Sequence, residues 1–306
     1  MAKDIVLVTG GTGNIGAAFV ALLAADARAP EVRVASRDPR SGGAALVQAL
    51  APARVAPVAF DVDRPETMRA ALEGVTKLFV IAPFVPDLAG WHEKVADAAR
   101  GNRSLELVVK SSVTGARGPT SVPAPGAVPL GHWKGEEAFR SAFPTVAIRP
   151  NIFMQHFLTV PGLYRAGDSR FYLPTGSARV SWLDARDIAA AAAALVLADP
   201  AVRRPLEGGA YELSGPTAPT AAEMAEVLAL VARRPMEHVD GVDAFSAHCK
   251  ELGVTDLAKH FYGEAAGGWF AKVEDDLFVK LLGRHTTSFT KFAMDHAAYF
   301  GGRTGD

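Results

Sequence analysis

Residues 5–16 read Ile-Val-Leu-Val-Thr-Gly-Gly-Thr-Gly-Asn-Ile-Gly, a short apolar run followed at once by a glycine-rich turn. Gly11, Gly13 and Gly16 match the spacing G-x-G-x-x-G, in which glycine permits a tight turn and a close approach of the backbone to a pyrophosphate. An anion is favoured at the start of the helix that follows, because the first N–H groups there have no partner. The turn therefore predicts a dinucleotide site. Its expected members are Gly10, Thr12, Gly13, Asn14, Ile15 and Gly16.

Two other proteins could carry such a turn. A methyltransferase uses a similar loop for a nucleoside without phosphates, and glycine-rich loops occur in other α/β proteins. Here the turn follows an apolar run and precedes an amphipathic stretch, which favours the dinucleotide.

From this turn outward, the first half of the chain alternates between segments with two different hydrophobic patterns. Nearly continuous apolar runs predict buried parallel strands at 5–8, 32–35, 55–60, 78–81, 105–109 and 146–148. Segments with helical spacing lie between them, at 15–25, 43–50, 66–73, 91–100 and 136–142. This alternation predicts an α/β fold with a doubly wound parallel Rossmann sheet.

The pattern changes after residue 150. We expect helix and loop at 151–170, strands at 180–183 and 211–213 around an alanine-rich helix at 188–198, and helices at 221–232, 243–252, 275–282 and 289–299. The predicted domains are a nucleotide-binding domain at 1–150, to which 178–215 return, and a smaller, mostly helical substrate-binding region at 151–177 and 216–306. That region is expected over the carboxyl ends of the strands, where open α/β sheets bind ligands.

Composition excludes several classes of protein. Among 306 residues, 32 Lys and Arg balance 33 Asp and Glu, so a strongly basic nucleic-acid binder is excluded. Cys249 is the only cysteine, and no H-E-x-x-H spacing occurs, so neither a disulfide nor a metal site is expected. No apolar run approaches the roughly 20 residues that span a bilayer. We expect a cytoplasmic protein, either monomeric or homodimeric, without a membrane or nucleic-acid partner.

The end of the second predicted strand indicates which nicotinamide cofactor is bound. Enzymes that prefer NAD carry an acidic residue there for the ribose hydroxyls. This chain has Ser36, Arg37 and Arg40, which suit the 2′-phosphate of NADPH. Asp38 is contrary evidence unless it pairs with an arginine, and the arginines could also be merely solvated.

Two more strand ends are expected to complete the cofactor site. Asp61 and Val62 follow the third strand and would meet the adenine, although Asp61 could instead cap the next helix. Ile81, Ala82 and Pro83 end the fourth strand, beneath the pyrophosphate and ribose.

The chain resembles the NmrA-like family of atypical short-chain dehydrogenases over nearly its full length. The resemblance rests on TGGTGNIG with Gly10, VVKSSV at 108–113, HWKGEEAF at 132–139, IRPNIFMQHF at 148–157, ARVSWLDARDIA at 178–189 and SFTKFAMDHAAYF at 288–300. It is most similar to the branch of ergot-alkaloid-type, quinone and imine reductases. The family includes NADPH-dependent reductases and also redox-sensing regulators without a reaction.

The resemblance implies a departure from short-chain dehydrogenase catalysis. Those enzymes use Tyr-x-x-x-Lys, but no tyrosine here precedes a lysine by four residues. The same region holds His132, Lys134 and Glu136. His132 is a candidate proton donor, and Lys134 could hold the ribose or stabilise charge. His132 could equally pack or cap the helix start, with Glu136 serving its first turn.

The remaining site residues also follow from the resemblance. Ser111 and Ser112, preceded by Lys110, end the fifth strand where the family approaches the nicotinamide, and Ser112 is a candidate catalytic residue. Pro150 and Phe153 follow the sixth strand, where backbone groups usually hold the carboxamide. A substrate wall for a flat aromatic acceptor is expected from Phe84, Trp133, Met154, His156 and Trp182.

These observations favour an NADPH-dependent reductase that transfers hydride to a conjugated or cationic acceptor, such as a quinone, an imine, an iminium or an enone. Reduction of a cationic iminium needs no added proton, and a reduced quinone oxyanion is delocalised, so neither requires the missing tyrosine. The alternative is a non-catalytic NADP(H)-sensing regulatory protein. A sugar-nucleotide epimerase is disfavoured because it relies on the Tyr/Lys pair.

Overall fold

The computed structural model describes residues 4–121, 126–254, 268 and 270–301. They divide into two compact units. Unit 1 takes Met1–Pro150, Arg186–Glu212 and Lys280–Leu282, and unit 2 takes Asn151–Ala185, Leu213–Val279 and Gly283–Asp306. Of the segment 178–215, residues 178–185 and 213–215 thus group with unit 2 and only the part between them with unit 1.

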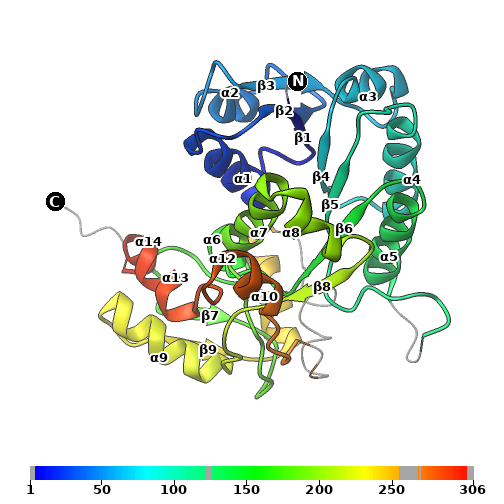
Figure 1. Cartoon of the computed structure of the whole chain (residues 1–306). Helices are drawn as coiled ribbons and strands as arrows, with labels where there is room; N and C mark the ends of the chain where they lie inside the picture. Colours follow the sequence, from blue (N-terminus) through cyan, green and yellow to red (C-terminus); the bar gives the residue numbers. More distant parts are fainter. Residues whose placement is uncertain (1–3, 122–125, 255–267, 269, 302–306) are drawn as a thin grey trace. The chain divides into compact units, whose positions relative to one another are not determined.

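The predicted parallel sheet is confirmed, and it is the centre of unit 1 (Figure 1). Its strands are β1 (Ile5–Val8), β2 (Glu31–Ser36), β3 (Val55–Ala59), β4 (Lys77–Ile81), β5 (Leu107–Ser111), β6 (Thr145–Pro150) and β8 (Ala210–Leu213). They lie in the order β3-β2-β1-β4-β5-β6-β8, and β1 to β6 pair in parallel. The order reverses between β1 and β4, which is the switch point at which such sheets bind ligands.

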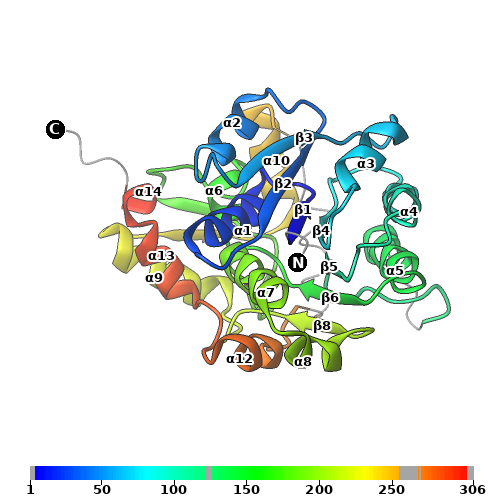
Figure 2. The same cartoon turned by 45° about the horizontal axis from the view of Figure 1, so that its top comes forward.

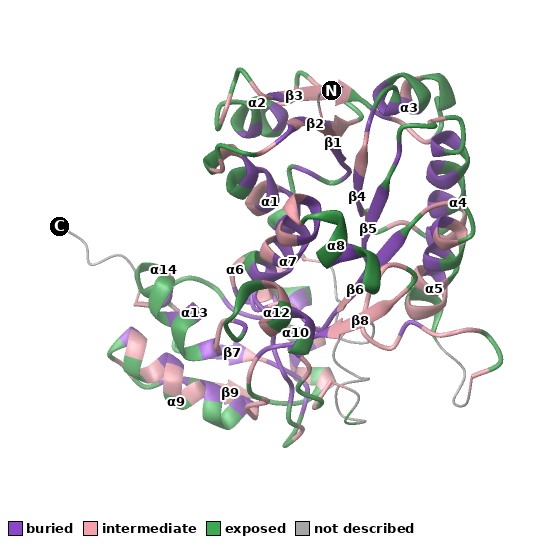
Figure 3. Ribbon diagram, in the orientation of Figure 1, coloured by how far each residue is buried: buried purple, intermediate pink, exposed green. Residues whose placement is uncertain are grey.

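Helices cover both faces of this sheet (Figure 2). One face carries α1 (Asn14–Ala25), α2 (Gly42–Gln48) and α7 (Ala185–Leu197), and the other carries α3 (Pro65–Leu72), α4 (Leu88–Ala99) and α5 (Ala127–Arg140). The short α8 (Pro200–Arg203) and η1 (Arg204–Leu206) precede β8. Burial follows this layering: β1, β4 and β5 and the inner sides of the helices are buried (Figure 3). Because helices cover both faces of the sheet, the sequences of these strands are nearly continuous apolar runs.

Several boundaries in unit 1 differ from the prediction by two or three residues, and the start of α5 differs by more. Helix α5 begins at Ala127, nine residues before the expected start at 136. Pro129 lies in its first turn, where a missing N–H costs nothing, and Gly131 and Gly135 are accommodated because α5 packs against α4. Strand β5 runs from Leu107 to Ser111, two residues later than expected.

Unit 2 contains a small parallel sheet of β7 (Arg170–Tyr172) and β9 (Glu237–Val239), which the sequence pattern did not predict. Its helices are α6 (His156–Thr159), α9 (Ala221–Ala232), α10 (Val242–Leu252), the first half of α12 (Asp276–Leu282), α13 (Phe289–Asp295) and α14 (Ala297–Gly301). Helix α9 starts where expected because Thr220 and Glu223 form a capping box. The core is aromatic and centres on Phe157, Phe171 and Phe292.

Two predictions in unit 2 are wrong. Residues 180–183 form no strand; only Leu183 makes a bridge, to Phe153. The helix predicted at 289–299 is interrupted at His296, which ends α13 before α14 begins. Nowhere in the described part of the chain does a helix combine the length and apolar character that crossing a membrane requires.

Candidate functional site

The glycine-rich turn joins β1 to α1 in the conformation that only glycine allows. Gly10 has a φ of +63° and lies against Ile81, the last residue of β4. A Cβ at Gly16 would overlap the carbonyl oxygen of Gly10 and the Cα of Gly11. A Cβ at Gly13 would meet nothing closer than the Gly10 oxygen at 3.5 Å. Gly16 therefore serves the fold of the turn, whereas the space beside Gly13 is open.

The amino end of α1 is open to an anion. Its N-cap is Gly13, which has no side chain to accept the free N–H groups of the first turn. Thr12, Gly13 and Asn14 are exposed, and Ile15 and Gly16 are buried beneath them. The arrangement of a helix start without a capping side chain is the one that holds a diphosphate.

Thr9 was missed by the sequence analysis, although it precedes the first glycine. Its Oγ1 donates to the carbonyl of Ile81 at 2.9 Å and accepts from the Ile81 N–H at 2.7 Å. The side chain thereby ties the end of β1 to the end of β4. These two hydrogen bonds hold the start of the glycine-rich turn against the end of β4, at the switch point of the sheet.

The end of β2 presents two exposed guanidinium groups, and the charge of one of them, Arg37, helps to lower the pKa of Asp61. Arg37 and Arg40 are exposed, and neither side chain bonds another described residue. Ser36 is engaged locally, since its Oγ donates to the carbonyl of Asp38 at 2.8 Å. The Asp38 carboxylate accepts the backbone N–H of Arg40 at 3.0 Å and forms no ion pair within the described ranges. The idea that Asp38 pairs with an arginine side chain is thus not supported.

The ends of β3 and β4 lie at the same edge of the sheet. Asp61 accepts the backbone N–H of Asp63 and pairs with Arg64 at 3.2 Å, and these contacts lower the pKa of Asp61 although burial raises it. Arg64, not Asp61, is the N-cap of α3, so the capping interpretation of Asp61 is wrong. Val62 packs partly into the core, Ile81 and Ala82 are half-buried, and Pro83 is exposed.

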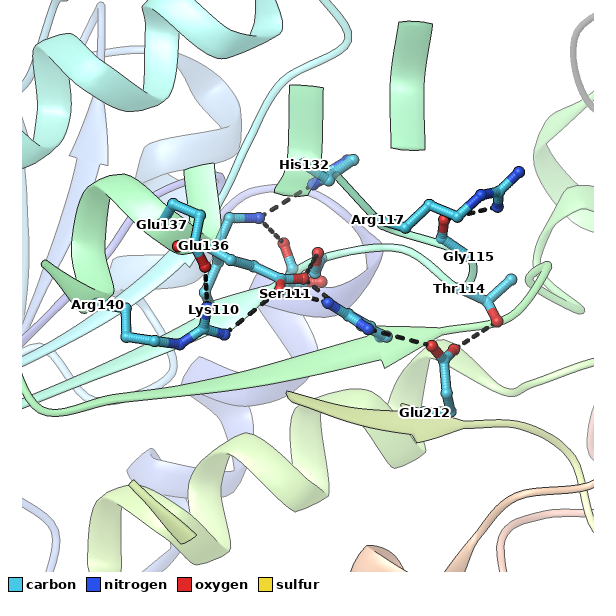
Figure 4. Close-up of polar contacts among 12 residues, drawn as sticks. Lys110, Ser111, Thr114, Gly115, Arg117, His132, Glu136, Glu137, Arg140 and Glu212 are labelled. Carbon is cyan, nitrogen blue, oxygen red and sulfur yellow. Dashed lines mark hydrogen bonds and ion pairs between the residues drawn. The ribbon is translucent and has the colours of Figure 1, made fainter. Parts of the chain in front are cut away.

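A buried lysine lies beneath the carboxyl end of β5. The Nζ of Lys110 donates to Nδ1 of His132 on α5 at 3.0 Å and to the carbonyl of Ser111 at 3.2 Å (Figure 4). Lys110 has no exposed surface. Burial lowers its pKa to about 7, an effect that Glu136 opposes and Arg149 strengthens. The sequence singled out His132 but not Lys110, whose side chain supplies the ionisable group.

His132 is held in its neutral form. Burial, the charge of Lys110 and the neighbouring His92 hold its pKa well below the usual value. The His92 ring on α4 lies 5.5 Å from the His132 ring, and burial followed by the charge of Lys110 lowers the pKa of His92 to about 2. A role for His132 as a charged imidazolium donor at neutral pH is therefore not supported, because the ring is uncharged there.

Ser112 faces α5 from the same side of β5 as Lys110, two residues earlier. Its Oγ donates to Oε1 of Glu136 at 2.5 Å. Glu136 is fully buried and accepts Nε and Nη2 of Arg149 at 2.9 and 2.6 Å. Burial raises the pKa of Glu136, but the bonds from Arg149 and Ser112 outweigh it and lower the pKa overall. This carboxylate is therefore charged, and it links α5 to Ser112 at the end of β5 and to Arg149 of β6.

A second carboxylate extends the network on the β8 side (Figure 4). Glu212 accepts Oγ1 of Thr114 at 2.5 Å and lies 3.6 Å from Arg149. Burial raises the pKa of Glu212. The hydrogen bond from Thr114 and the charge of Arg149 offset part of this increase. The backbone N–H of Thr114 donates to the Pro150 carbonyl at 2.9 Å, so that oxygen is already bonded.

Of the other candidates on α5 and β5, Ser111 contacts Lys110 through its backbone carbonyl. Lys134 is exposed on the side of α5 away from β5. Trp133 is half-buried and packs against Gly118. Ser111 is buried at the end of β5. Phe84 follows β4 and is 74% exposed.

Three expected members of the substrate wall belong to unit 2. Met154 and Trp182 are core side chains, since each is only 1% exposed and lies in the aromatic cluster of that unit. The prediction that they line an open wall is not supported, because their surface is already filled by Phe157 and its neighbours. His156 is half-buried with its ring 5.8 Å from that of Phe153, and burial lowers its pKa to about 4.

No group of His, Cys, Asp and Glu with the arrangement of a metal site occurs among residues 4–121, 126–254, 268 and 270–301. Cys249 is buried and forms no disulfide. Polar chemistry in unit 1 is therefore concentrated at the glycine-rich turn, at the end of β2 and around Lys110.

Comparisons with known proteins agree with this geometry. Residues 2–218 match the model of the NmrA-like family. The chain is 33% identical to the NAD(P)H azoreductase of Xenophilus azovorans, over 97% of this chain and 99% of that one. It is 31% identical to the (4-alkanoyl-5-oxo-2,5-dihydrofuran-3-yl)methyl phosphate reductase of Streptomyces griseus, over 97% and 99% of the two chains.

A solved structure shows the same fold. Triphenylmethane reductase from a Citrobacter species superimposes with a TM-score of 0.78 at 22% identity, covering 95% of this chain and 98% of that one. The match of the family model over more than two thirds of the sequence leads to one conclusion. This chain belongs to the NmrA-like family.

Proposed function

We propose that this protein is an NADPH-dependent reductase that transfers hydride to a conjugated or cationic acceptor. The observation that carries the proposal is the open amino end of α1 at the glycine-rich turn, at the same sheet edge as the exposed guanidinium groups of Arg37 and Arg40. Relatives of at least 31% identity that are named as reductases, one of them as an NAD(P)H enzyme, support it.

The residues present fit the cofactor. The space beside Gly13 accepts a diphosphate, and the uncapped N–H groups of α1 supply its hydrogen bonds. Arg37 and Arg40 would hold the 2′-phosphate, because a guanidinium matches phosphate geometry. Thr9 and Ile81 keep the turn in place beneath the pyrophosphate. When bound, the nicotinamide supplies the hydride, and the protein's part is to orient the reactants and exclude water.

The acceptor is inferred from what the chain lacks. No tyrosine stands four residues before a lysine, so the usual phenol donor for ketones is missing. An acceptor that is cationic, or whose reduced form is a delocalised anion, makes the smallest demand for a proton. The azoreductase and triphenylmethane reductase relatives are named for conjugated dyes, which is consistent with a flat aromatic substrate for this chain. Phe84 and Trp133 are the aromatic side chains of unit 1 that could contact it.

The proposal is tested by measuring NADPH oxidation with three acceptors: 1,4-naphthoquinone, a cyclic imine and crystal violet. Turnover of at least one acceptor above the uncatalysed rate is expected. Gly13→Asp is the matched control, because the protein has room for the side chain but its carboxylate repels the diphosphate. The variant should fold normally and lose turnover.

Two other results would reject the proposal. Absence of NADPH binding in a fluorescence titration would remove its basis. Tight NADPH binding without turnover of any acceptor, together with a copurifying protein, would favour a regulatory NADP(H) sensor instead.

A further inference from the structure

Lys110 is a charged group without direct access to solvent. Its side chain is completely buried, and its Nζ has two hydrogen-bond partners among the described residues, the Ser111 carbonyl and Nδ1 of His132. A carbonyl oxygen cannot pass a proton on, whereas an imidazole can, because it has two nitrogens. His132 is partly exposed. The path by which Lys110 exchanges a proton therefore leads through the His132 ring.

The direction of the hydrogen bond fixes the tautomer of His132. An ammonium group donates and never accepts, so Nδ1 carries no proton while Lys110 is charged. The neutral ring then carries its proton on Nε2. In a doubly protonated ring, the Nδ1–H group of His132 would face the ammonium group of Lys110, and neither group could accept a hydrogen bond from the other. The charge of Lys110 also disfavours this form of the ring. His132 is thus prepared to donate from Nε2 without ever becoming charged in the resting state.

The groups around Lys110 keep it able to release a proton. Glu136 of α5 attracts its charge and Arg149 of β6 repels it, while burial favours the neutral amine. His92 of α4 and His132 of α5 are both uncharged at neutral pH. Arg149 is itself neutralised by Glu136 and lies near Glu212. The amine and the ammonium of Lys110 are therefore both populated near neutral pH.

We propose that Lys110 is a positioning residue that acts through His132 as a two-step proton relay for acceptors that become anionic on reduction. The inference rests on the proposed reductase function. In the relay, the Nε2–H bond of His132 breaks and its proton goes to the anionic oxygen or nitrogen of the reduced acceptor. At the same time an Nζ–H bond of Lys110 breaks, and that proton goes to Nδ1. The neutral amine is then reprotonated from solvent through the same ring.

The relay makes opposite predictions for two acceptors. Crystal violet is a cation, and hydride alone converts it to its neutral product. A naphthoquinone gives an oxyanion, which needs one proton. Lys110→Met should lower kcat for 1,4-naphthoquinone by about a hundredfold, at the lower end of the range of general acid catalysis. For crystal violet, kcat should change less than twofold.

The pH profile distinguishes a relay from a structural role. In the wild type, kcat for the quinone should fall above pH of about 7, as Lys110 loses its proton. Lys110→Met should remove that fall, and crystal violet should not show it in either protein. The matched control is Lys94→Met, at an exposed lysine of α4, which should leave both acceptors and the pH profile unchanged.

A second readout needs neither cofactor nor acceptor. In ¹⁵N-histidine-labelled protein at pH 6, with His132 assigned by His132→Gln, the ring should show an unprotonated Nδ1 and a protonated Nε2. Lys110→Met should shift that pattern toward a mixture of tautomers. The melting temperature and circular dichroism spectrum of each variant identify any loss of folding, and Lys110→Arg provides a second variant that keeps a donor but cannot release its proton. Lys110→Arg should retain the tautomer and lose the quinone activity.

Unchanged nitrogen shifts in folded Lys110→Met, or equal effects of this variant on both acceptors, would overturn the relay. Failure of the proposed function looks different. In that case the wild type would turn over no acceptor at all, while the His132 tautomer in the unliganded protein would still depend on Lys110.

Discussion

Gly13 and Gly16 are three residues apart in one turn, yet a methyl group has opposite consequences at the two positions. At Gly16 it overlaps backbone atoms of Gly10 and Gly11, which cannot move without opening the turn. At Gly13 it makes only an ordinary van der Waals contact with the Gly10 oxygen at 3.5 Å, and the backbone there is extended, so alanine adopts it without strain. Gly16 thus serves folding, and Gly13 serves the ligand.

Gly16→Ala should therefore lower the free energy of unfolding by about 3 kcal/mol, at the upper end of the cost of overpacking. Gly13→Ala should melt like the wild type but bind NADPH at least tenfold more weakly, because its methyl group occupies the place of the diphosphate. Thermal melting and a fluorescence titration of both variants check this. Equal NADPH affinity in Gly13→Ala and wild type would contradict the placement of the diphosphate.

Arg37 and Arg40 are expected to discriminate between the two nicotinamide cofactors. A hydrogen bond to a charged group contributes about 1.5–3 kcal/mol, so the double variant Arg37→Ser/Arg40→Ser should bind NADPH roughly ten- to a hundredfold more weakly. The Kd for NADH should stay within a factor of two. Arg103→Ser, an exposed arginine that precedes β5 at the opposite sheet edge, is the control. If the wild type bound both cofactors equally, these arginines would have no such role.

At the level of single elements, α5 shows which contacts a sequence pattern can predict and which it cannot. His132 and Glu136 are four residues apart and lie on one face of α5, which the structure turns toward β5. Pro129 and two glycines hid the first two turns of the helix, because propensity is weaker than packing against α4. Lys110 looked like part of a strand, and only the three-dimensional contact with His132 reveals its importance.

The packing of α5 on α4 depends on Gly135. A Cβ there would overlap the ring of His92, which is fully buried. Alanine gains about 1 kcal/mol of helix propensity over glycine, but overpacking costs about 1–3 kcal/mol, so we expect Gly135→Ala to be destabilised. Thermal or urea unfolding would measure it, with exposed Gly101→Ala as the control. A stabilised Gly135→Ala would show that the two helices separate easily.

At the scale of the whole molecule, the buried carboxylate of Glu136 makes stability depend on acidity. Its pKa is lower in the folded protein than the usual 4.5, so its contribution is complete above about pH 4.5 and disappears as the pH falls through the folded value. Glu136→Gln should lose about 3 kcal/mol at pH 7, because Arg149 is left without its main partner.

Melting curves of wild type and Glu136→Gln between pH 7 and pH 3 check this. The difference between the two should shrink as the pH falls below about 4.5. Glu137→Gln, one residue further along the same helix and half exposed, should cost less than about 0.5 kcal/mol at any pH. A constant difference for Glu136→Gln would mean that its charge does not matter to folding.

The overall architecture was largely predictable because short sequence patterns, such as apolar runs and capping residues, indicate the same elements that the structure contains. The apolar runs gave β1 to β6, and the capping residues before α9 fixed its start. The strands β7 and β9 were not predictable. Each has only three residues, too few to show the hydrophobic pattern of a strand, and their pairing joins segments more than sixty residues apart. Trp182 and Met154 were misplaced for a related reason: an aromatic wall and an aromatic core have the same sequence pattern.

The enclosure of Lys110 has a consequence for covalent labelling. Surface lysines are protonated at neutral pH and therefore react slowly with acylating reagents, although they are accessible. Lys110 has the more nucleophilic amine, but no reagent reaches it while β5 and α5 stay together. Its acylation, followed by mass spectrometry, would therefore time the rare openings of the protein interior at one known position.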